Sequence, residues 1–374
     1  MSNAAEQILE RARWAPSGDN TQPWRFQIMN EFHIAVHGFD TREYCLYDLN
    51  GFGSQLAHGA LLETIRLAAT GLYLRADISR RPGTPETHPI YDILLHTDEQ
   101  NEPDVLLPFI EQRCTQRRVL STTPLTQDEK WELTASVGNF YTLLWIDGWH
   151  GRWSMARLLF ANAKIRLTIP EAYEVHRDAI EWHASESVDR IPDAAVGLDP
   201  FTLKFMRWAM GSWQRVSFLN RFLAGHLIPR IELDLLPALF CAGHFVLLRN
   251  NAPEGIDDNV EAGRAVQRFW LTATKLGLQM QPEITPLVFS KYVREKLPLS
   301  QVGAANREAR RLAVVLDRLA GGQCANAVFM GRLGHGQRPQ ARSRRISLSG
   351  LEVETDETGG RAGNPAVSSK GANG

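Results

Sequence analysis

The segment from Arg13 to Phe26, RWAPSGDNTQPWRF, constrains the fold more than any other part of the sequence. Apolar residues at helical spacing precede it over residues 3–14, and the alternating stretches WRFQIMN and HIAVHGF follow it, so the pattern predicts a helix, a tight turn and a β-hairpin. Gly18 permits close approach of another group, Asn20 can donate to or accept from a carbonyl-rich ring, and Trp24 supplies a flat apolar wall. A planar ligand with polar edges needs these features, although an ordinary turn beside a core tryptophan would use the same residues.

Helical and alternating patterns recur along the rest of the chain and indicate an α+β fold of two lobes, with helices around antiparallel or mixed sheets. The acidic, proline-containing stretch TDEQNEPD predicts an exposed connection between a first lobe of residues 1–102 and a second lobe of residues 103–347. The predicted helices are residues 52–71, 103–113, 126–137, 258–276 and 303–320, and the predicted strands are residues 76–81, 90–96, 141–147, 239–250 and 325–334.

Residues from about 170 to 230 form a helical, aromatic-rich block that prolines interrupt. We interpret this block as an insertion in the second lobe that covers a ligand site. Trp208 and Trp213, together with Phe218, are candidates to line a substrate pocket, although aromatic residues at helical spacing more often pack in a core. Residues 348–374 are poor in large apolar groups and rich in Gly, Ser and Asn, which predicts a disordered tail.

The charges of the chain nearly cancel, with 41 lysines and arginines against 42 acidic residues. This balance suggests neither nucleic acid nor an anionic membrane as a partner. The first residues lack the apolar core of a signal peptide and no apolar stretch is long enough to span a bilayer, so we expect a cytoplasmic protein. The four cysteines form no CxxC pair and the eleven histidines no HExxH motif, so neither a disulfide framework nor a metal site is predicted.

The first turn resembles the APSxxNxQPWxF signature of the nitroreductase superfamily, whose members bind FMN. In the short members, which are homodimers, this turn reaches a flavin bound mainly by the other subunit. The resemblance therefore implies that Pro16, Ser17 and Asn20 contact FMN. The positions that match the signature in register are Ala15, Pro16, Ser17, Asn20, Gln22, Pro23, Trp24 and Phe26.

The second part of the family pattern follows the turn instead of preceding it. Short members hold the FMN phosphate with an RxSxR-type motif ahead of the turn, whereas here Arg113, Thr115 and Arg117 come a lobe later. This order resembles the fused, two-lobed Acg-type branch, in which two nitroreductase-like halves of one chain imitate the family homodimer. It implies one composite FMN site per chain. Two guanidinium groups at i, i+4 can converge on one phosphate, while an isolated RxTxR is more often an exposed helix end.

Two later segments also resemble flavin-contacting parts of the family. Gly277 ends a predicted helix, and the family places backbone groups near the flavin ring just after such a glycine, which makes Gln279 and Met280 candidate FMN contacts, with Gln281 beside them. A closing strand and a basic arm come near the C-terminus. Arg344 is the first candidate there for a phosphate contact, and the arginines that compete with it are Arg332, Arg342 and Arg345.

The resemblance implies an FMN-dependent NAD(P)H oxidoreductase that reduces a small nitroaromatic, quinone or activated-alkene acceptor by a ping-pong cycle, with NADH or NADPH as donor. Because the flavin performs the redox chemistry, no side chain is predicted to be catalytic. A flavin-sequestering protein with little reductase activity, or a specialised flavin dehydrogenase in a biosynthetic pathway, would share the same motifs. The chain is expected to be a monomer or a homodimer.

Overall fold

The computed structural model describes residues 3–353 and contains two four-stranded antiparallel sheets. This architecture confirms the α+β class. The first sheet has the order β1-β2-β4-β3 and consists of β1 (Trp24–Asn30), β2 (His33–Gly38), β3 (Leu74–Arg80) and β4 (Ile90–Thr97). The second has the order β10-β11-β9-β5 and consists of β5 (Tyr141–Asp147), β9 (Gly243–Arg249), β10 (Leu278–Pro282) and β11 (Ala327–His335).

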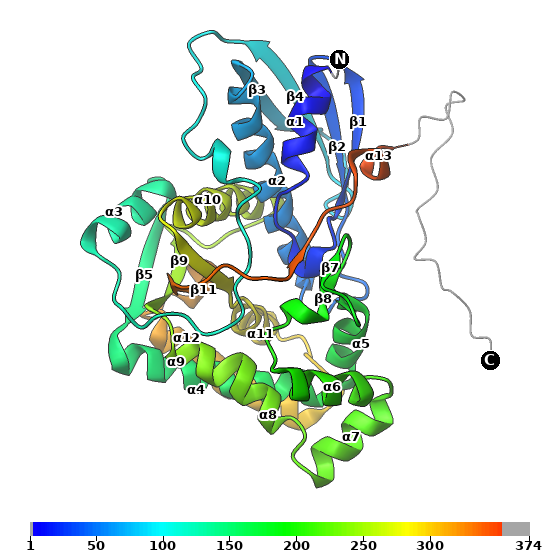
Figure 1. The fold of residues 1–374 in the computed structure, drawn as a ribbon, viewed down its shortest axis with the longest axis vertical. Coiled ribbons are helices and arrows are strands. Elements are labelled where there is room, and N and C mark those ends of the chain that lie inside the picture. Colours follow the sequence, from blue (N-terminus) through cyan, green and yellow to red (C-terminus); the bar gives the residue numbers. More distant parts are fainter. Residues whose placement is uncertain (1–2, 354–374) are drawn as a thin grey trace, which may run out of the picture.

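Helices pack around both sheets (Figure 1). They are α1 (Ala4–Ala12), α2 (Phe52–Thr70), α3 (Gln127–Ser136), α4 (Gly148–Thr168), α5 (Pro170–Ala179), α6 (Pro200–Ala209), α7 (Trp213–Phe222), α8 (Leu227–Arg230), α9 (Leu236–Leu239), α10 (Ile256–Lys275), α11 (Thr285–Arg294), α12 (Gly303–Leu319) and α13 (Leu348–Leu351). Four two-residue strands lie near the meeting point of the lobes: β6 (Ile180–Glu181), β7 (Glu186–Ser187), β8 (Ile191–Pro192) and β12 (Arg342–Ser343).

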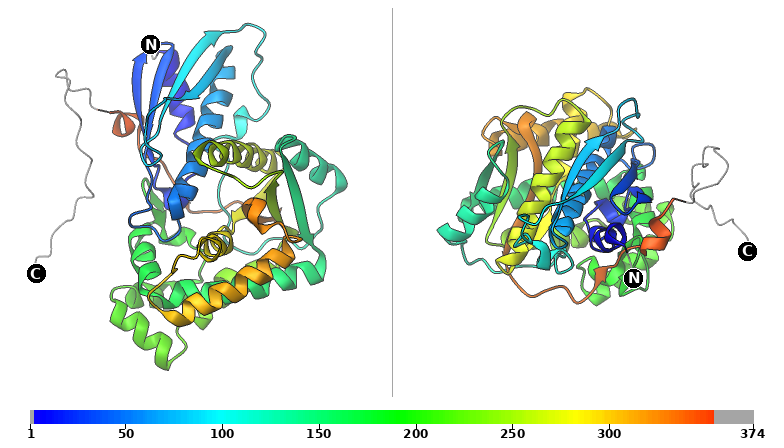
Figure 2. Two further views of the ribbon diagram at one scale, coloured as in Figure 1. Left: turned by 180° about the vertical axis from the view of Figure 1, so that it is seen from behind. Right: turned by 90° about the horizontal axis from the view of Figure 1, so that it is seen from above.

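Helices α2 and α10 join the two lobes, and Figure 2 shows them side by side. Gly59 and Gly263 make this close approach possible, because a Cβ on either glycine would collide with the backbone of the other helix. The buried Asn259 amide donates to Gln55 at 2.7 Å across the same contact. The glycines therefore fix the distance between the lobes, and with it the width of any site that both lobes form.

Each lobe has its own hydrophobic core. Trp24 and Phe26 of β1 are fully buried in the core of the first lobe, where α1 and α2 cover the sheet. Phe245 and Phe269 stack at 4.5 Å between their ring centres in the core of the second lobe. Trp24 is thus a core residue, as the ordinary-turn interpretation of the first motif expects.

The predicted helix over residues 103–113 is wrong. Only the single 3-10 turn Leu107–Phe109 forms in that range. Pro108 lacks an N–H donor for a continuing helix, and the Asp104 carboxylate accepts from the Leu106 N–H and pairs with Arg268 at 3.2 Å. These contacts hold the segment as an irregular connection between the lobes.

The chain returns to the first lobe beyond residue 335. Residues 336–353, here called the C-terminal strap, run from β11 across the junction of the lobes to α13 beside β1 (Figure 1). Leu348 and Leu351 are buried in the first core, and the Val353 N–H donates to the Phe26 carbonyl at 2.8 Å. Residues 348–353 therefore pack on the first lobe although the sequence predicts disorder there, because two leucines within one turn supply an apolar face. The remaining residues of the predicted tail, 354–374, lie outside the described part.

Candidate functional site

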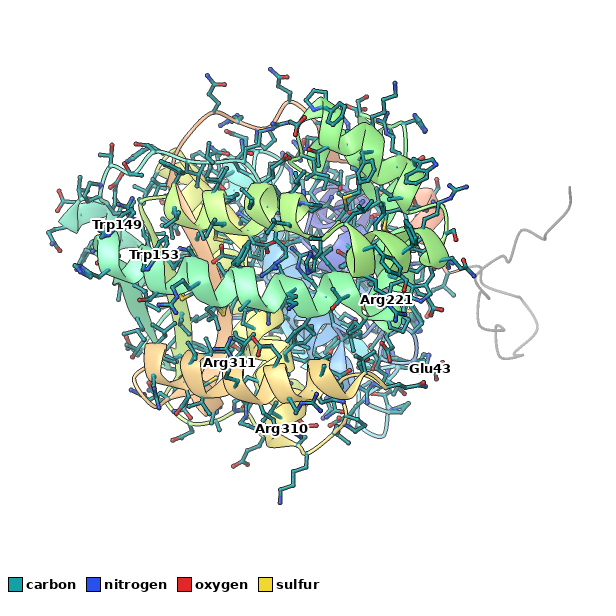
Figure 3. All side chains as sticks on the ribbon, turned by 90° about the horizontal axis from the view of Figure 1, so that it is seen from below. Glu43, Trp149, Trp153, Arg221, Arg310 and Arg311 are labelled. Carbon is teal, nitrogen blue, oxygen red and sulfur yellow. The ribbon has the colours of Figure 1, made fainter. Side chains whose placement is uncertain are left out.

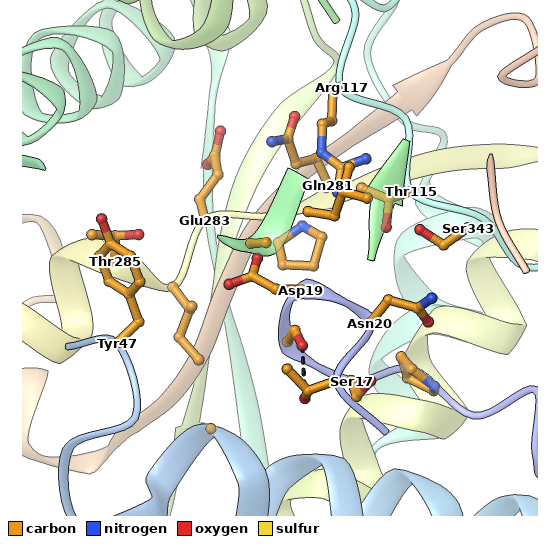
Figure 4. Close-up of a pocket in the computed structure, with 18 of the residues that line it drawn as sticks. Ser17, Asp19, Asn20, Tyr47, Thr115, Arg117, Gln281, Glu283, Thr285 and Ser343 are labelled. Carbon is orange, nitrogen blue, oxygen red and sulfur yellow. Dashed lines mark hydrogen bonds between the residues drawn. The ribbon is translucent and has the colours of Figure 1, made fainter. Parts of the chain in front are cut away.

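A cavity of about 460 Å³ lies where the two lobes meet (Figure 4). The first lobe contributes the turn at residues 16–23, the loop before α2 and the first turns of α2. The second lobe contributes residues 113–117, α4, α5, the segment after β10 and part of the C-terminal strap. The volume is within the usual range for small-ligand and cofactor sites.

The first turn is tightly wound. Asp19, Asn20 and Gln22 have φ of 48°, 63° and 47°, so three residues other than glycine occupy the left-handed region within four positions. The Ser17 hydroxyl accepts from the Gln22 N–H at 3.0 Å and supports this conformation. Such strain persists only when the surroundings hold it, and it is concentrated at functional sites.

Asn20 connects this turn to the second lobe. Its buried amide nitrogen donates to the carbonyls of Val188, Arg190 and Arg344 at 3.1 to 3.3 Å. Its amide oxygen is buried and has no hydrogen-bond partner, and the residue lines the cavity. Asn162 of α4 also lines the cavity and leaves its amide nitrogen without a partner. These two amides therefore offer one buried acceptor and one buried donor, both of which need a ligand or water.

An arginine cluster, defined as Arg113, Arg342 and Arg345, lines the cavity. Arg345 donates to the Ala15 carbonyl at 3.1 Å, and Arg113 donates to the Trp14 carbonyl at the same distance. The Arg342 guanidinium lies 4.8 Å from the centre of the Trp14 ring. None of the three forms an ion pair with a carboxylate anywhere in residues 3–353.

Burial and mutual repulsion lower the pKa values of two arginines of the cluster. Burial and the charge of Arg342 lower the pKa of Arg113 to about 10. Burial and the charges of Arg113 and Arg342 hold the pKa of Arg345 well below its ordinary value. The Nε atoms of Arg113 and Arg342 are buried without an acceptor. Uncompensated buried cations with free donors form a binding site for an anion such as phosphate.

Thr115 and Arg117 also line the cavity. Thr115 forms a parallel bridge with Met280, which fixes this extended segment to the second sheet. Arg117 donates to the Ala195 carbonyl at 3.2 Å. Asp19 faces Arg117 in the cavity, as Figure 4 shows, and its carboxylate accepts no hydrogen bond from residues 3–353. Burial raises the pKa of Asp19, and the charge of Arg117 opposes that rise.

A second polar group lines the cavity around Tyr47, which Figure 4 shows on the other side of the view from Thr115 and Ser343. The Tyr47 hydroxyl lies 2.9 Å from His176 Nε2, and the two rings stack at 5.7 Å between centres. Arg166 donates to both carboxylate oxygens of Asp234 at 2.8 Å beside them. Burial, and then the charge of Arg166, lowers the pKa of His176 to about 3, while burial raises the pKa of Tyr47. Both side chains are therefore neutral near pH 7.

The neutral Tyr47–His176 pair holds two polar hydrogens, one on the phenol and one on the imidazole. Their mutual hydrogen bond uses one of them, whichever tautomer is present. The other hydrogen remains to donate to a ligand, since neither side chain bonds to another residue in the described range. The pair can therefore bind an oxygen atom of a neutral molecule.

Gln279 and Met280 do not line the cavity, whereas Gln281 and Glu283, farther along the same segment, do. Met280 is buried in the core of the second lobe, because strand alternation turns it away from the cavity. Glu283 accepts from His244 Nδ1 at 2.8 Å. Burial opposes protonation of His244, but the Glu283 carboxylate raises the pKa of His244 to about 10.

Arg344 does not line the cavity. It is exposed and pairs with Glu186 at 2.6 Å, whereas Arg342 and Arg345 of the same strap reach the site. Arg332 is buried but also lies outside the lining, where it donates to backbone carbonyls that include that of Arg117 at 2.9 Å.

Trp208 and Trp213 lie outside the cavity as well. Trp208 is 52% exposed, and Trp213 packs on Tyr173 at 5.5 Å between ring centres. Met206 is the member of α6 that lines the cavity. The helical block thus contributes to the wall mainly through residues near β6 and β8.

Comparison with known proteins yields distant structural similarity only. Neither a protein-family model nor a curated protein matches the sequence. A nitroreductase-like family protein from Bacillus cereus is 13% identical over 68% of this chain and 97% of its own, with a TM-score of 0.33. A nitroreductase with bound FMN from Bacteroides fragilis is 11% identical over 68% of this chain and 100% of its own, with a TM-score of 0.35. The FMN-dependent nitroreductase NfnB from Mycobacterium smegmatis, in complex with NADPH, is 13% identical over 66% of this chain and 96% of its own, with a TM-score of 0.34. At these scores the similarity assigns no cofactor and no activity to this chain.

Proposed function

We propose that this chain is an FMN-binding, NAD(P)H-dependent oxidoreductase of the fused, two-lobed nitroreductase type, which reduces a small nitroaromatic, quinone or activated alkene. The observation that carries the proposal is the arginine cluster, which has no carboxylate partner in residues 3–353 and lines a cavity of about 460 Å³. An anionic ligand would relieve the repulsion within the cluster. The phosphate of FMN is such an anion, and the motif of the first turn favours it over other phosphates.

The other polar groups of the cavity fit a flavin. A flavin ring has N–H donors and carbonyl acceptors on one edge, and the cavity has an unpartnered acceptor on Asn20 and an unpartnered donor on Asn162. Pro16 and Ser17 line the same wall as Asn20, and Trp270 adds an aromatic surface. Arg113, Arg342 and Arg345 would hold the phosphate, with the Thr115 hydroxyl nearby.

FMN supplies the redox chemistry between a nicotinamide and an organic acceptor when it is bound. The chain's own residues would bind and orient the reactants. The Tyr47–His176 pair keeps one polar hydrogen to donate to an oxygen of a nitro or quinone group. The neutrality of this pair and the Arg166–Asp234 ion pair favour an uncharged acceptor there, because neither group leaves an unbalanced charge.

Retention of FMN with little turnover is the second candidate function. Residues 186–192 cover the first turn, where Val188 accepts from both Asn20 and Gln22, the latter at 2.8 Å. A cover held by these hydrogen bonds would keep a nicotinamide away from the flavin. The two functions use the same phosphate site and differ only in access.

Absorbance spectroscopy tests both candidates. The purified chain is reconstituted with FMN, desalted, and then mixed anaerobically with NADH or NADPH. Retained flavin absorbance that bleaches supports the reductase, and retained absorbance that resists both donors favours retention without turnover. A protein that keeps no flavin after desalting contradicts both.

A further inference from the structure

The segment between Asp199 and Glu232 is unlike the rest of the chain in its charges. It contains no acidic residue, five lysines and arginines, and many large apolar side chains. Helices α6 and α7 form most of it, and α7 projects from the end of the molecule opposite the first sheet (Figure 1). The near-neutral balance of the whole chain, from which the sequence predicts no membrane partner, conceals this local excess of positive charge.

The large apolar side chains of this segment are exposed. Phe222 and Leu223 are 63% and 66% exposed, and Trp208 and Phe218 are more than half exposed. They form pairs instead of being scattered, since the rings of Phe218 and Phe222 lie 5.0 Å apart and those of Phe205 and Trp208 lie 5.8 Å apart. A cluster of exposed aromatic rings marks an interaction surface more often than single exposed residues do.

Positive charges share the same surface with these rings. The Arg215 guanidinium lies 5.2 Å from the centre of the Trp208 ring, and that of Arg221 lies 5.5 Å from the Phe222 ring. Neither arginine has a carboxylate ion-pair partner among the described residues, whereas Arg207 is neutralised by Asp193 at 2.6 Å. We call the surface formed by Phe205, Trp208, Arg215, Phe218, Arg221 and Phe222 the basic aromatic face.

The neighbouring helices extend this character across the underside of the molecule. Figure 3 shows Trp149 and Trp153 of α4 at one end of that side and Arg221 at the other. The two tryptophans are exposed and stack at 6.0 Å, and α4 contains no acidic residue. Arg310 and Arg311 of α12 lie on the same side, where Glu308 pairs with Arg311 at 2.6 Å and Glu43 lies at the edge.

We propose that the basic aromatic face docks on an anionic lipid surface. Basic residues attract anionic headgroups, and aromatic and aliphatic side chains enter the boundary between headgroups and acyl chains. A symmetric contact with a second copy would bring the unpaired Arg215 and Arg221 of both copies into one interface, which is unfavourable. Nucleic acid would neutralise the arginines but would leave Leu223 and the neighbouring Ile228 exposed to water.

The proposed contact lies along the membrane surface and does not cross it. No helix in residues 3–353 is both long and apolar enough to span a bilayer. Helices α6 and α7 have ten residues each and carry arginine beside their aromatic rings, which suits attachment at the headgroup level. This attachment needs neither FMN nor turnover, so it is independent of the proposed function.

Vesicle co-sedimentation of the full chain tests the proposal. The protein is expected to sediment with vesicles of phosphatidylcholine mixed with phosphatidylglycerol, to bind pure phosphatidylcholine much more weakly, and to dissociate as salt is raised. The charge reversal Arg215→Glu/Arg221→Glu is expected to weaken binding to the anionic vesicles by about tenfold or more. The variant Phe218→Ser/Phe222→Ser, which removes only exposed rings, is expected to weaken it severalfold.

Two matched variants on distant surfaces serve as controls. Trp131→Ser removes a ring of α3 that is more exposed, at 71%, than Phe218 or Phe222, and Arg11→Glu/Arg75→Glu changes the net charge by the same amount on the first lobe. Both are expected to bind like the wild type. Equal loss in the control and test variants, or binding that ignores the anionic lipid, would overturn the proposal. The absence of vesicle binding would overturn it as well. A dimer that depends on Phe218 and Phe222 would then identify a second copy of the chain as the partner of this face.

Discussion

The two polar regions of the cavity differ in how their charges are balanced. The arginine cluster has backbone carbonyl acceptors and the rings of Trp14 and Trp270 around it but no carboxylate among the described residues, so its charge is uncompensated. Away from it, Arg166 is held by both oxygens of Asp234, and His176 is neutral beside Tyr47. A protein can keep buried cations without a counter-ion only at a cost in stability, and it recovers that cost when an anion binds. The first region therefore suits a charged ligand group and the second a neutral one.

The largest expected effect comes from breaking the ion pair between Arg166 and Asp234. Arg166→Met leaves the buried Asp234 carboxylate without its partner, and burial already raises the pKa of that group. We expect the free energy of unfolding of the FMN-free protein to fall by about 3 kcal/mol, measured by urea denaturation. Removal of both charges in Arg166→Met/Asp234→Leu is expected to restore most of the loss. If the single and double variants lost the same free energy of unfolding, the idea that Arg166 and Asp234 balance one another's charge would be wrong.

A variant of the arginine cluster is expected to lose affinity for FMN while its stability changes little. Arg345→Met removes a buried cation that its neighbours repel, so relief of repulsion offsets the lost hydrogen bonds to carbonyls. We expect the FMN-free protein to change in stability by less than about 1 kcal/mol, while the dissociation constant for FMN rises by about 10- to 100-fold in equilibrium titration.

Arg344→Met is the matched control for that experiment. Arg344 is the adjacent residue, is exposed and pairs with Glu186, so its loss is expected to change neither stability nor FMN affinity. If Arg344→Met released FMN and Arg345→Met retained it, the assignment of the phosphate to the arginine cluster would be wrong.

The contrast between Arg344 and Arg345 also shows what the sequence can predict. The sequence predicts the first turn and the Arg113–Arg117 segment as parts of the site because each is a local motif, and both line one cavity in the structure. The choice among arginines of the strap depends on which side chain faces inward, and a segment without regular alternation does not reveal this.

The sequence does not predict the Tyr47–His176 pair, for a different reason. Tyr47 and His176 are separated by 129 positions, and neither belongs to a motif. Asp19 lies within the first motif but at one of its variable positions. Most helices and strands follow from hydrophobic periodicity. The helix predicted at 103–113 does not form, because Asp104 forms ion pairs with distant arginines that hold the segment in an irregular conformation. Contacts between distant residues are what the sequence pattern lacks.

Hydrogen-bond donation by the Tyr47–His176 pair can be tested by removing its two polar hydrogens one at a time. Tyr47→Phe and His176→Phe each leave one polar hydrogen in the pair, so each is expected to change the KM for a nitroaromatic or quinone acceptor by less than about threefold. The double variant leaves none and is expected to raise KM by about tenfold. FMN retention is expected to stay constant in all three. Equal effects of one single variant and the double variant would assign the donor to that one residue.

The remaining test is the pH dependence of stability from the same histidine. Burial and Arg166 lower the pKa of His176 from its ordinary 6.5 to about 3 in the folded chain. Between these two values the unfolded chain binds a proton at this position and the folded chain does not, so acidification favours unfolding. The free energy of unfolding is expected to fall below pH 6.5 with a slope of up to about 1.4 kcal/mol per pH unit from this group. Because other groups titrate in the same range, the measurement is the difference between urea denaturation curves of the wild type and His176→Phe from pH 4 to 7. The variant is expected to lose less stability on acidification. Parallel profiles would show that His176 becomes protonated in the folded chain, and the region would then carry a positive charge like the arginine cluster.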